Sequence, residues 1–311
     1  MLGVPHVTYR ENRSSYHVPI RLERTKLLDL AEVLSLIQLD WLEHGIQYVE
    51  EQLLYHEIEC LLSISGVSGE EDAVREVVKE KLTRYVDHIT EDHYGNLLAE
   101  KTYGSGNGPT ILLNAHLDTV DDIVEGRSII KEGNIWSSSQ GILGGNNRAG
   151  VAVLLTIAKH LNQSKFNGKV KYIFTVEEEV GLAGAVQVDD YFLWGVDAAI
   201  VLDRRGNGDI VTSCGGIIPF CSEQYGEFFE TVAKEAGLKG WACTAGGSSD
   251  TRVWARHGIQ SVNLSVGYGN EHTDDEFLDV HATYQTYTLL KAVFQKPNEL
   301  RRVSREISRI K

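Results

Sequence analysis

Few cysteines and no long apolar run distinguish this 311-residue sequence at first reading. None of its four cysteines belongs to a C-x-x-C pair, which argues against a zinc ribbon or a dithiol redox motif. Scattered thiols in a chain of this length are typical of a reducing compartment. The first residues lack the apolar stretch of a signal peptide, and no run approaches the length of a membrane span. We therefore expect a cytoplasmic protein that does not bind membranes.

Basic side chains are also scarce. The chain has 30 Lys and Arg against 44 Asp and Glu, so its formal net charge is −14. A surface of this sign repels phosphate backbones, and nucleic acid is therefore not expected as a partner. The rest of the composition is that of a globular protein, and the chain is long enough to bury a substantial core.

The spacing of apolar residues along the chain predicts an α/β fold. Residues 1–25 are polar and are expected to have little regular structure, whereas residues 26–62 have helical spacing that is interrupted near Gly45. Further helices are predicted at 70–85 (capped by Ser68), 150–161, 181–187, 223–236 and 280–294, and strands at 92–100, 110–116, 169–176, 197–202 and 259–266. This alternation predicts a three-layer sandwich with a mostly parallel central sheet flanked by helices.

Candidate metal ligands recur where successive predicted strands end. His116 and Asp118 end the first buried strand, Glu177–Glu179 follow the next, Asp203 follows the third and His272 comes after the last. Ligands of open α/β sheets bind beyond the carboxyl ends of the strands, and imidazole and carboxylate groups together suit a metal ion. One such residue alone is more often an ordinary polar side chain. The repetition at several strand ends predicts a metal site.

At these positions the sequence resembles the zinc peptidases with two neighbouring metal ions, which include aminopeptidase, tripeptidase and aminoacylase relatives. The segments NAHLDTV, GGNNRAGVA, FTVEEEVGLAGA, VLDRRG and GNEHTDDE stand in the order of the family's metal motifs, between about Tyr55 and Phe294. The resemblance implies a peptidase-like catalytic domain over residues 55–300. It leaves residues 1–54 as a helical extension and residues 301–311 as a basic tail.

The resemblance also implies a role for each motif residue. His116 and Asp203 would hold the first metal and Glu179 and His272 the second, with Asn146 at the position between them. The implied cofactor is zinc, with the number of ions open between one and two and with cobalt or manganese as alternatives.

The implied catalytic residues are Glu178 and Asp118. Glu178 would be the general base that takes a proton from a metal-activated water, and Glu177 would lie outside the site. Asp118 would orient His116 by accepting a hydrogen bond from its ring. The alternatives are a solvated acidic loop for the three glutamates and a surface aspartate for Asp118.

One motif departs from the family. An aspartate bridges the two metals in these proteins, whereas Asn146 stands at that position here and Asn147 follows where a second acid is usual. An amide contributes one neutral oxygen, so it offsets less of the repulsion between two cations about 3.5–4 Å apart. The chain could work with one tightly held metal, recruit another acid such as Asp121 or Asp122, or be a pseudoenzyme or binding protein. We favour retained catalysis, because Glu178 and the other ligands are present.

The spacing of the motifs predicts a domain without a lid. Only 30 positions separate His116 from Asn146 and only 69 separate Asp203 from His272, whereas many relatives insert a domain of about one hundred residues. This layout resembles that of the single-domain aminopeptidases, and the resemblance implies an exopeptidase of the aminopeptidase type that acts on short peptides. The alternative is a related amidohydrolase that removes an acyl group. Whether the N-terminal helices mediate a homo-oligomer stays open.

Two weaker features lie near these motifs. Arg204 and Arg205 follow the Asp203 ligand, where they either hold a substrate carboxylate or neutralise the surrounding acids. In GGSSD, Asp250 either lines the pocket or follows a helix cap at Ser248 or Ser249.

Overall fold

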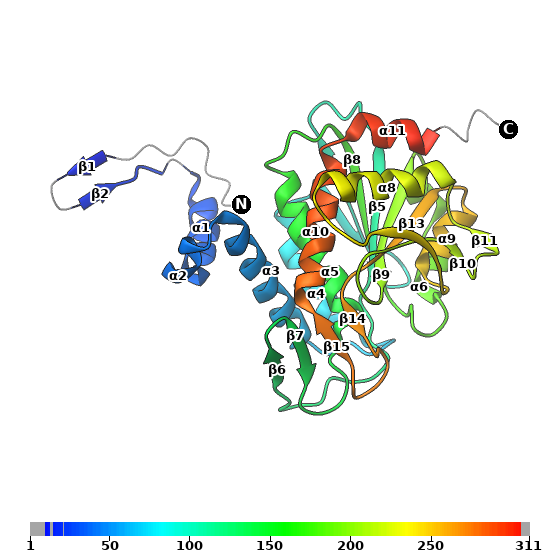
Figure 1. Ribbon diagram of the computed structural model, residues 1–311, viewed down its shortest axis with the longest axis horizontal. Coiled ribbons are helices and arrows are strands. Elements are labelled where there is room, and N and C mark those ends of the chain that lie inside the picture. The colour runs from blue at the N-terminus through cyan, green and yellow to red at the C-terminus, as the bar shows by residue number, and fades with distance from the viewer. Residues whose placement is uncertain (1–9, 13–14, 21, 306–311) are drawn as a thin grey trace. The chain divides into compact units, whose positions relative to one another are not determined.

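The computed structural model describes residues 10–12, 15–20 and 22–305, and it divides the chain into two compact units at His56 and Glu57 (Figure 1). Residues 1–9 of the predicted N-terminal extension and residues 306–311 of the predicted basic tail lie outside this described part. All candidate site residues belong to the second unit.

The first unit is mainly helical. Its helices are α1 (Arg24–Leu36) and α2 (Leu39–Glu43), and α3 (Ile46–Leu62) runs through the boundary into the second unit. The predicted interruption at Gly45 is confirmed, because this glycine has a φ of 88° between α2 and α3. The expectation of little regular structure before residue 25 is wrong in part. Strands β1 (Arg10–Asn12) and β2 (Ser15–His17) pair antiparallel there.

The second unit is built on a mixed sheet of nine strands, in the order β11-β10-β13-β9-β5-β8-β4-β3 with β12 beside β10. The strands are β3 (His88–Glu91), β4 (Leu97–Tyr103), β5 (Thr110–His116), β8 (Gly168–Thr175), β9 (Ala198–Arg204), β10 (Asp209–Cys214), β11 (Ile218–Pro219), β12 (Ala242–Gly246) and β13 (Gln260–Ser265). The central strands β13, β9, β5 and β8 are parallel, and they coincide with four of the predicted strands. Their apolar runs are buried on both faces, as is usual for parallel strands.

Helices cover both faces of this sheet (Figure 1). Helices α4 (Asp72–Thr83), α5 (Gly145–Leu161), α10 (Val280–Phe294) and α8 (Glu223–Glu235) pack against one another in this order on one side. On the other side, α6 (Ala183–Gln187), α7 (Asp190–Leu193) and α9 (Asp250–Arg256) contribute apolar side chains to a core around Trp254. The predicted three-layer α/β sandwich is therefore confirmed.

A small second sheet, which the sequence did not predict, lies beside this sandwich. Its order is β14 (Tyr268–Gly269), β15 (Phe277–Asp279), β7 (Ile135–Ser138) and β6 (Ile129–Glu132). Strands β6 and β7 are the only elements described between β5 and α5, so no lid domain stands in that part of the chain. Strands β14 and β15 enclose the loop that carries His272.

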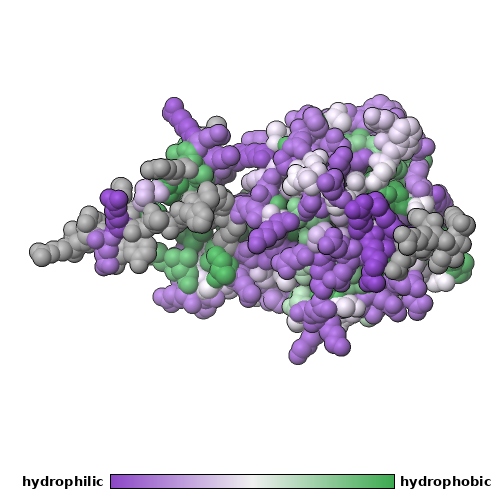
Figure 2. Space-filling model, turned by 90° about the horizontal axis from the view of Figure 1, so that it is seen from above, coloured by the Kyte–Doolittle hydropathy of each residue, from purple (hydrophilic) through white to green (hydrophobic). Residues whose placement is uncertain are grey.

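The ends and the surface of the second unit complete the description. Helix α11 (Pro297–Arg305) buries Leu300 and Val303, so the first part of the predicted basic tail packs on the domain. The face shown in Figure 2 is mostly hydrophilic, in keeping with the many acidic side chains of the sequence. Among the described residues, no helix combines the length and the apolar character needed to cross a membrane.

Candidate metal centre

The five predicted ligands converge at one edge of the parallel sheet. They come from the end of β5 (His116), the start of α5 (Asn146), the loop after β8 (Glu179), the end of β9 (Asp203) and the loop between β14 and β15 (His272). These are segments far apart in sequence that the parallel strands bring to the same edge. The convergence is the geometry that a metal site requires.

The ligand atoms form two groups that share Asn146. In the first group, Nε2 of His116 lies 3.3 Å from Oδ1 of Asn146 and 3.3 Å from Oδ1 of Asp203. In the second, Nδ2 of Asn146 lies 2.6 Å from Oε1 of Glu179 and 3.1 Å from Nε2 of His272. Glu179 and His272 are themselves 2.8 Å apart. Asn146 therefore stands between the two groups, as the family pattern implied for the bridging position.

The first group fits a cation. A tetrahedral zinc with bonds of about 2.0–2.1 Å places its ligand atoms about 3.3 Å from one another. The two distances of 3.3 Å around His116 match this spacing. Imidazole nitrogen and carboxylate oxygen are also donors that zinc accepts.

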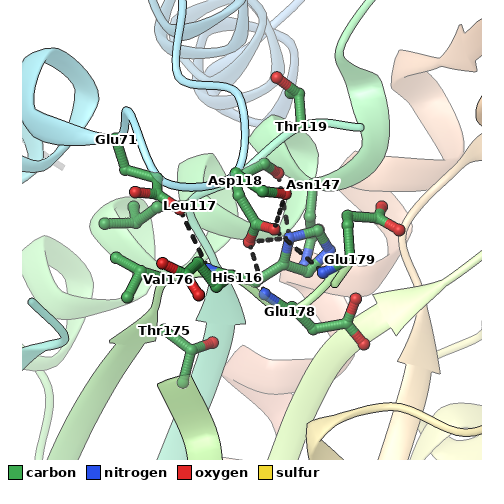
Figure 3. Close-up of polar contacts among 12 residues, drawn as sticks. Glu71, His116, Leu117, Asp118, Thr119, Asn147, Thr175, Val176, Glu178 and Glu179 are labelled. Carbon is green, nitrogen blue, oxygen red and sulfur yellow. Dashed lines mark hydrogen bonds and ion pairs between the residues drawn. The ribbon is translucent and has the colours of Figure 1, made fainter. Parts of the chain in front are cut away.

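Asp118 ties the strand end of His116 to the glutamate loop (Figure 3). Its Oδ1 lies 3.2 Å from Nδ1 of His116, and its two oxygens accept the backbone N–H groups of Glu178 and Glu179 at 3.0 Å. Burial alone would raise the pKa of Asp118, but the hydrogen bonds from His116 and from these backbone groups lower it to about 2. An ionised Asp118 can thus fix the orientation of the His116 ring, as expected from the sequence.

Ser68 has a different role from the one predicted. It does not cap a helix, because α4 begins at Asp72, and its hydroxyl donates to Oδ2 of Asp118 at 2.8 Å. The prediction of a Ser68 cap is therefore wrong. The contact with Asp118 is long-range, so local sequence gave no indication of it.

The three consecutive glutamates point in different directions. Glu179 contacts Asn146 and His272, as described above, whereas Glu177 accepts a hydrogen bond from the hydroxyl of Tyr94 at 2.7 Å. Glu178 lies between them in sequence. One of its carboxylate oxygens lies within 4.8 Å of a possible metal-ligand atom of His116 and of Glu179. Glu177 therefore lies outside the ligand group and Glu178 faces it, which agrees with the register expected from the sequence.

Glu178 lies in an unusual electrostatic environment. It is only 9% exposed, and burial, together with the nearby carboxylate of Asp203, raises its pKa well above the usual range. For His116, burial acts to lower the pKa, but the adjacent Asp203 and Asp118 carboxylates raise it overall. Strong perturbation of several neighbouring groups is typical of functional sites.

The backbone around the ligands is also unusual. Glu177 has a φ of 51° and His272 a φ of 66°, in the left-handed region that residues other than glycine rarely adopt. The Asn146–Asn147 peptide bond is cis. Left-handed φ values at residues such as Glu177 and His272 cluster at functional sites, where surrounding contacts hold them in place.

Glu276 is a site residue that the sequence did not single out. It is 2% exposed and accepts the backbone N–H groups of Gly144 at 2.7 Å and of Asn146 at 2.8 Å. These bonds hold the segment that carries Asn146 in place. Glu276 belongs to the motif GNEHTDDE, and this membership was the signal that could have identified it.

Replacing Glu276 tests this positioning. In Glu276→Gln, one of the two carboxylate oxygens becomes an NH₂ group that faces a backbone N–H, so the loop loses an acceptor. Outer partners of metal ligands typically change affinity by about 10–100-fold, and we expect a loss of this size for the first bound metal ion. The measurement is a metal titration of the folded variant. Glu299→Gln on α11, an exposed site, is the control and should bind metal like wild type. Equal affinities in all three proteins would remove Glu276 from the site.

Two further residues, Tyr268 and Asp250, lie next to the centre. Tyr268 donates its hydroxyl to Oδ1 of Asp203 at 3.0 Å, a contact that the sequence did not indicate. Asp250 is buried beneath the site, where it accepts the hydroxyl of Thr175, and burial raises its pKa. Ser249 caps α9 by accepting the backbone N–H of Thr251. Asp250 is therefore a buried neighbour of the centre. The helix cap expected at Ser248 or Ser249 is formed by Ser249.

An open cavity of about 180 Å³ adjoins the centre. Its lining includes Asn146, Glu178, Glu179, Asp203 and His272 together with the two arginines after Asp203. Both arginines already have acidic partners, because Arg204 pairs with Asp209 at 2.8 Å and Arg205 with Glu271 at 2.6 Å. This arrangement favours the interpretation that they balance nearby acids.

Asp121 and Asp122 do not take the bridging position. Both are exposed, and the Asp122 carboxylate accepts a hydrogen bond from Ser65 at 3.1 Å. Asp121 accepts the backbone N–H of Asp122. The idea that one of them replaces the missing bridging acid is therefore not supported by their placement.

Comparison with known proteins agrees with the fold and the motifs. A profile of the M42 glutamyl aminopeptidase family matches residues 144–289. The chain is 28% identical over 150 residues to the uncharacterized protein YqjE of Bacillus subtilis, which covers 45% of this chain and 40% of that protein. It is 24% identical over 247 residues to a putative aminopeptidase of Acetivibrio thermocellus, with 54% of this chain and 73% of that protein covered. The matched part thus spans less than half of the B. subtilis relative.

Solved structures with the same fold include aminopeptidases. The aminopeptidase PepT of Bacillus cereus has a TM-score of 0.71 at 19% identity and covers 80% of this chain and 98% of its own. The aminopeptidase APDkam598 of Desulfurococcus kamchatkensis has a TM-score of 0.68 at 20% identity, with 81% and 98% covered. The predicted resemblance to the co-catalytic metallopeptidases is confirmed, and the predicted class of enzyme, a peptidase, agrees with these matches.

Proposed function

We propose that this chain, which has the fold and the ordered motifs of the co-catalytic metallopeptidases, is a metal-dependent exopeptidase that removes residues from the N-terminus of short peptides. The observation that carries the proposal is the convergence of five ligand side chains beside Glu178, whose carboxylate is within reach of the same centre. Zinc is the proposed ion, because His and carboxylate donors suit it, with cobalt or manganese as substitutes.

Each residue has a role in this proposal. His116 and Asp203 would hold the ion, and Asn146, Glu179 and His272 would complete the centre. The ion would supply the Lewis acidity that activates water. Asp118 keeps the His116 ring in the orientation that presents Nε2 to the centre. The Glu178 carboxylate takes a proton from the attacking water and delivers it to the departing amine.

The acidic centre favours an aminopeptidase over a deacylase. Glu178, Glu179 and Asp203 line the cavity beside the ligands, and such a pocket attracts the ammonium group of a free peptide N-terminus. An acyl group carries no charge and gains nothing from this field. The related amidohydrolase remains the second candidate, because the water chemistry is the same.

A substrate panel tests this choice. The purified chain, supplied with zinc, should cleave di- and tripeptides with a free amino terminus and release the N-terminal residue. The same peptides with an acetylated N-terminus should be cleaved at least about tenfold more slowly, since they lack the ammonium group. Preferential hydrolysis of acylated amino acids would replace the proposal by the amidohydrolase. No hydrolysis of any compound with metal bound would favour a binding protein.

The proposal also covers the cellular location and the oligomeric state of the chain. The four cysteines, all within the described part of the chain, form no disulfide bond, which supports the proposal of a cytoplasmic location. Structural neighbours include the TET1 peptidase of Pyrococcus horikoshii, which can assemble into a tetrahedron or a large octahedral shell. By this analogy we propose that the chain forms a homo-oligomer.

A further inference from the structure

We propose that this centre binds one divalent cation tightly, at His116, Asp203 and Asn146, and that the Asn146 amide takes the place of a second cation between Glu179 and His272. The inference rests on the proposed function, because it concerns the same centre. It specifies how many metal ions that centre binds. It is carried by the different character of the two groups of ligand atoms.

The first group consists of three atoms that can all bind a cation. Oδ1 of Asp118 lies 3.2 Å from Nδ1 of His116, so Nε2 is the ring nitrogen that faces the centre. Nε2 lies 3.3 Å from Oδ1 of Asp203 and 3.3 Å from Oδ1 of Asn146. An imidazole nitrogen, a carboxylate oxygen and an amide oxygen are all suitable ligands for a divalent ion. Their separation also matches the ligand spacing of a tetrahedral ion, about 3.3 Å.

The second group faces the donor end of the same amide. Oε1 of Glu179 accepts only, so the atom of Asn146 that lies 2.6 Å away must be the amide nitrogen. This NH₂ group also lies 3.1 Å from Nε2 of His272, which is itself 2.8 Å from Oε1 of Glu179. These distances of 2.6–3.1 Å are those of hydrogen bonds and are shorter than the ligand spacing around a metal ion. An NH₂ group has no lone pair to offer a cation, so the amide presents no ligand atom to a second ion.

The contacts of Asn146 fix the direction of its amide. Its backbone N–H is held by Glu276, and its side chain is only 8% exposed. Turning the amide over would place its oxygen against the Glu179 carboxylate and its NH₂ group toward the first group. The orientation that satisfies Glu179 is therefore also the one that offers Oδ1 to the first cation.

Charge favours the same stoichiometry. In each group, one carboxylate (Asp203 or Glu179) and one imidazole are present, and the shared residue is neutral. Two cations about 3.5–4 Å apart need an anion between them to offset their repulsion, and Asn146 cannot provide it. The second ion would also have to displace the amide hydrogen bond to Glu179. Both effects weaken the second binding event and leave the first intact.

The test is the metal stoichiometry of the full-length chain. The protein is stripped with a chelator, dialysed, and titrated with Zn²⁺ by calorimetry, and the bound metal is counted by elemental analysis after desalting. Wild type should bind about one equivalent, and Asn146→Asp should bind about two, with the second ion held at least about a hundredfold more tightly than in wild type. Asn207→Asp adds the same charge at an exposed position and should stay at one equivalent.

Two further variants assign the retained ion to the first group. His272→Ala should still bind one equivalent, whereas His116→Ala should bind none, with folding checked by circular dichroism. Cobalt provides a spectroscopic readout. Wild type loaded with Co²⁺ should give the paramagnetic resonance signal of an isolated ion, and Asn146→Asp should give a weaker signal because two close ions couple.

The outcomes separate this inference from the proposed function. Two equivalents of similar affinity in wild type would overturn the one-cation centre even if peptides are hydrolysed. One equivalent in both wild type and Asn146→Asp would overturn the role given to the amide. One equivalent in wild type, two in the variant and no hydrolysis of peptides would support the inference and sink the proposed function instead.

Discussion

Glu178→Gln should lower kcat for peptide hydrolysis by about a hundred- to ten-thousandfold, the range that a positioned general base contributes. The amide keeps the size of the side chain but cannot accept a proton from water. Glu178 is not required to hold the ion in this proposal, so the variant should retain the metal content of wild type. The measurements are steady-state kinetics on a peptide substrate and elemental analysis of the same preparation.

The adjacent glutamate provides the matched control. Glu177 binds the hydroxyl of Tyr94 and lies outside the ligand group, so Glu177→Gln should keep most of its activity. Equal losses in the two variants would point to damage of the loop as a whole. Full activity in Glu178→Gln, with a loss in Glu177→Gln, would mean that the base belongs to the other residue.

His116, Glu179 and Asp203 could be found from the sequence because each ends or follows a strand that is itself easy to recognise. Asn146, at the start of α5, and His272, in the loop after β14, were found through their motifs. Strands β5, β8, β9 and β13 are buried on both faces, and their runs of apolar residues stand out. A polar residue directly after such a run has few structural reasons to be there. The order of the motifs then assigned the roles by resemblance, and the structure brings the same residues together.

Other parts of the unit depend on contacts that no local pattern contains. Strands β6, β7, β14 and β15 are short, and all but β14 are partly exposed, so they lack a continuous apolar run. Glu276 and Tyr268 act through partners that are far away in sequence, Asn146 and Asp203. Serine is a residue type that often caps helices, but the Ser68 side chain instead forms a long-range hydrogen bond to Asp118.

Asn146 shows what each kind of observation contributes. Its position in the motif was enough to predict a weaker bridge between two cations, because an amide lacks the charge of a carboxylate. The direction of the amide could not be predicted, since it depends on Glu179, His272 and Glu276, which come from other segments. Because the amide oxygen faces His116 and the amide nitrogen faces Glu179, we infer that Asn146 weakens metal binding on the Glu179 side and not on the His116 side.

Removing the metal should abolish peptide hydrolysis, with a loss of roughly three orders of magnitude or more. Lewis-acid activation of water contributes several kcal/mol to such reactions, and about 1.4 kcal/mol corresponds to a factor of ten in rate. Protein stripped with a chelator and dialysed should regain activity on addition of Zn²⁺, with Co²⁺ and Mn²⁺ compared in parallel. Because the proposed centre needs one ion, activity should be restored with about one equivalent.

His116→Ala should give the same loss without any chelator and should not recover at moderate Zn²⁺ concentrations. In the proposed centre His116 would bind the ion through Nε2, and Asp118 lies 3.2 Å from its Nδ1, so alanine removes both the ligand nitrogen and its link to Asp118. His257→Ala is the control, because His257 is a partly exposed histidine paired with Asp190 away from the ligands. Activity that survives both the chelator and His116→Ala would show that hydrolysis does not depend on this centre. A loss in His116→Ala that exceeds the loss on chelation would mean that the imidazole also acts without metal, since stripping leaves the side chain in place.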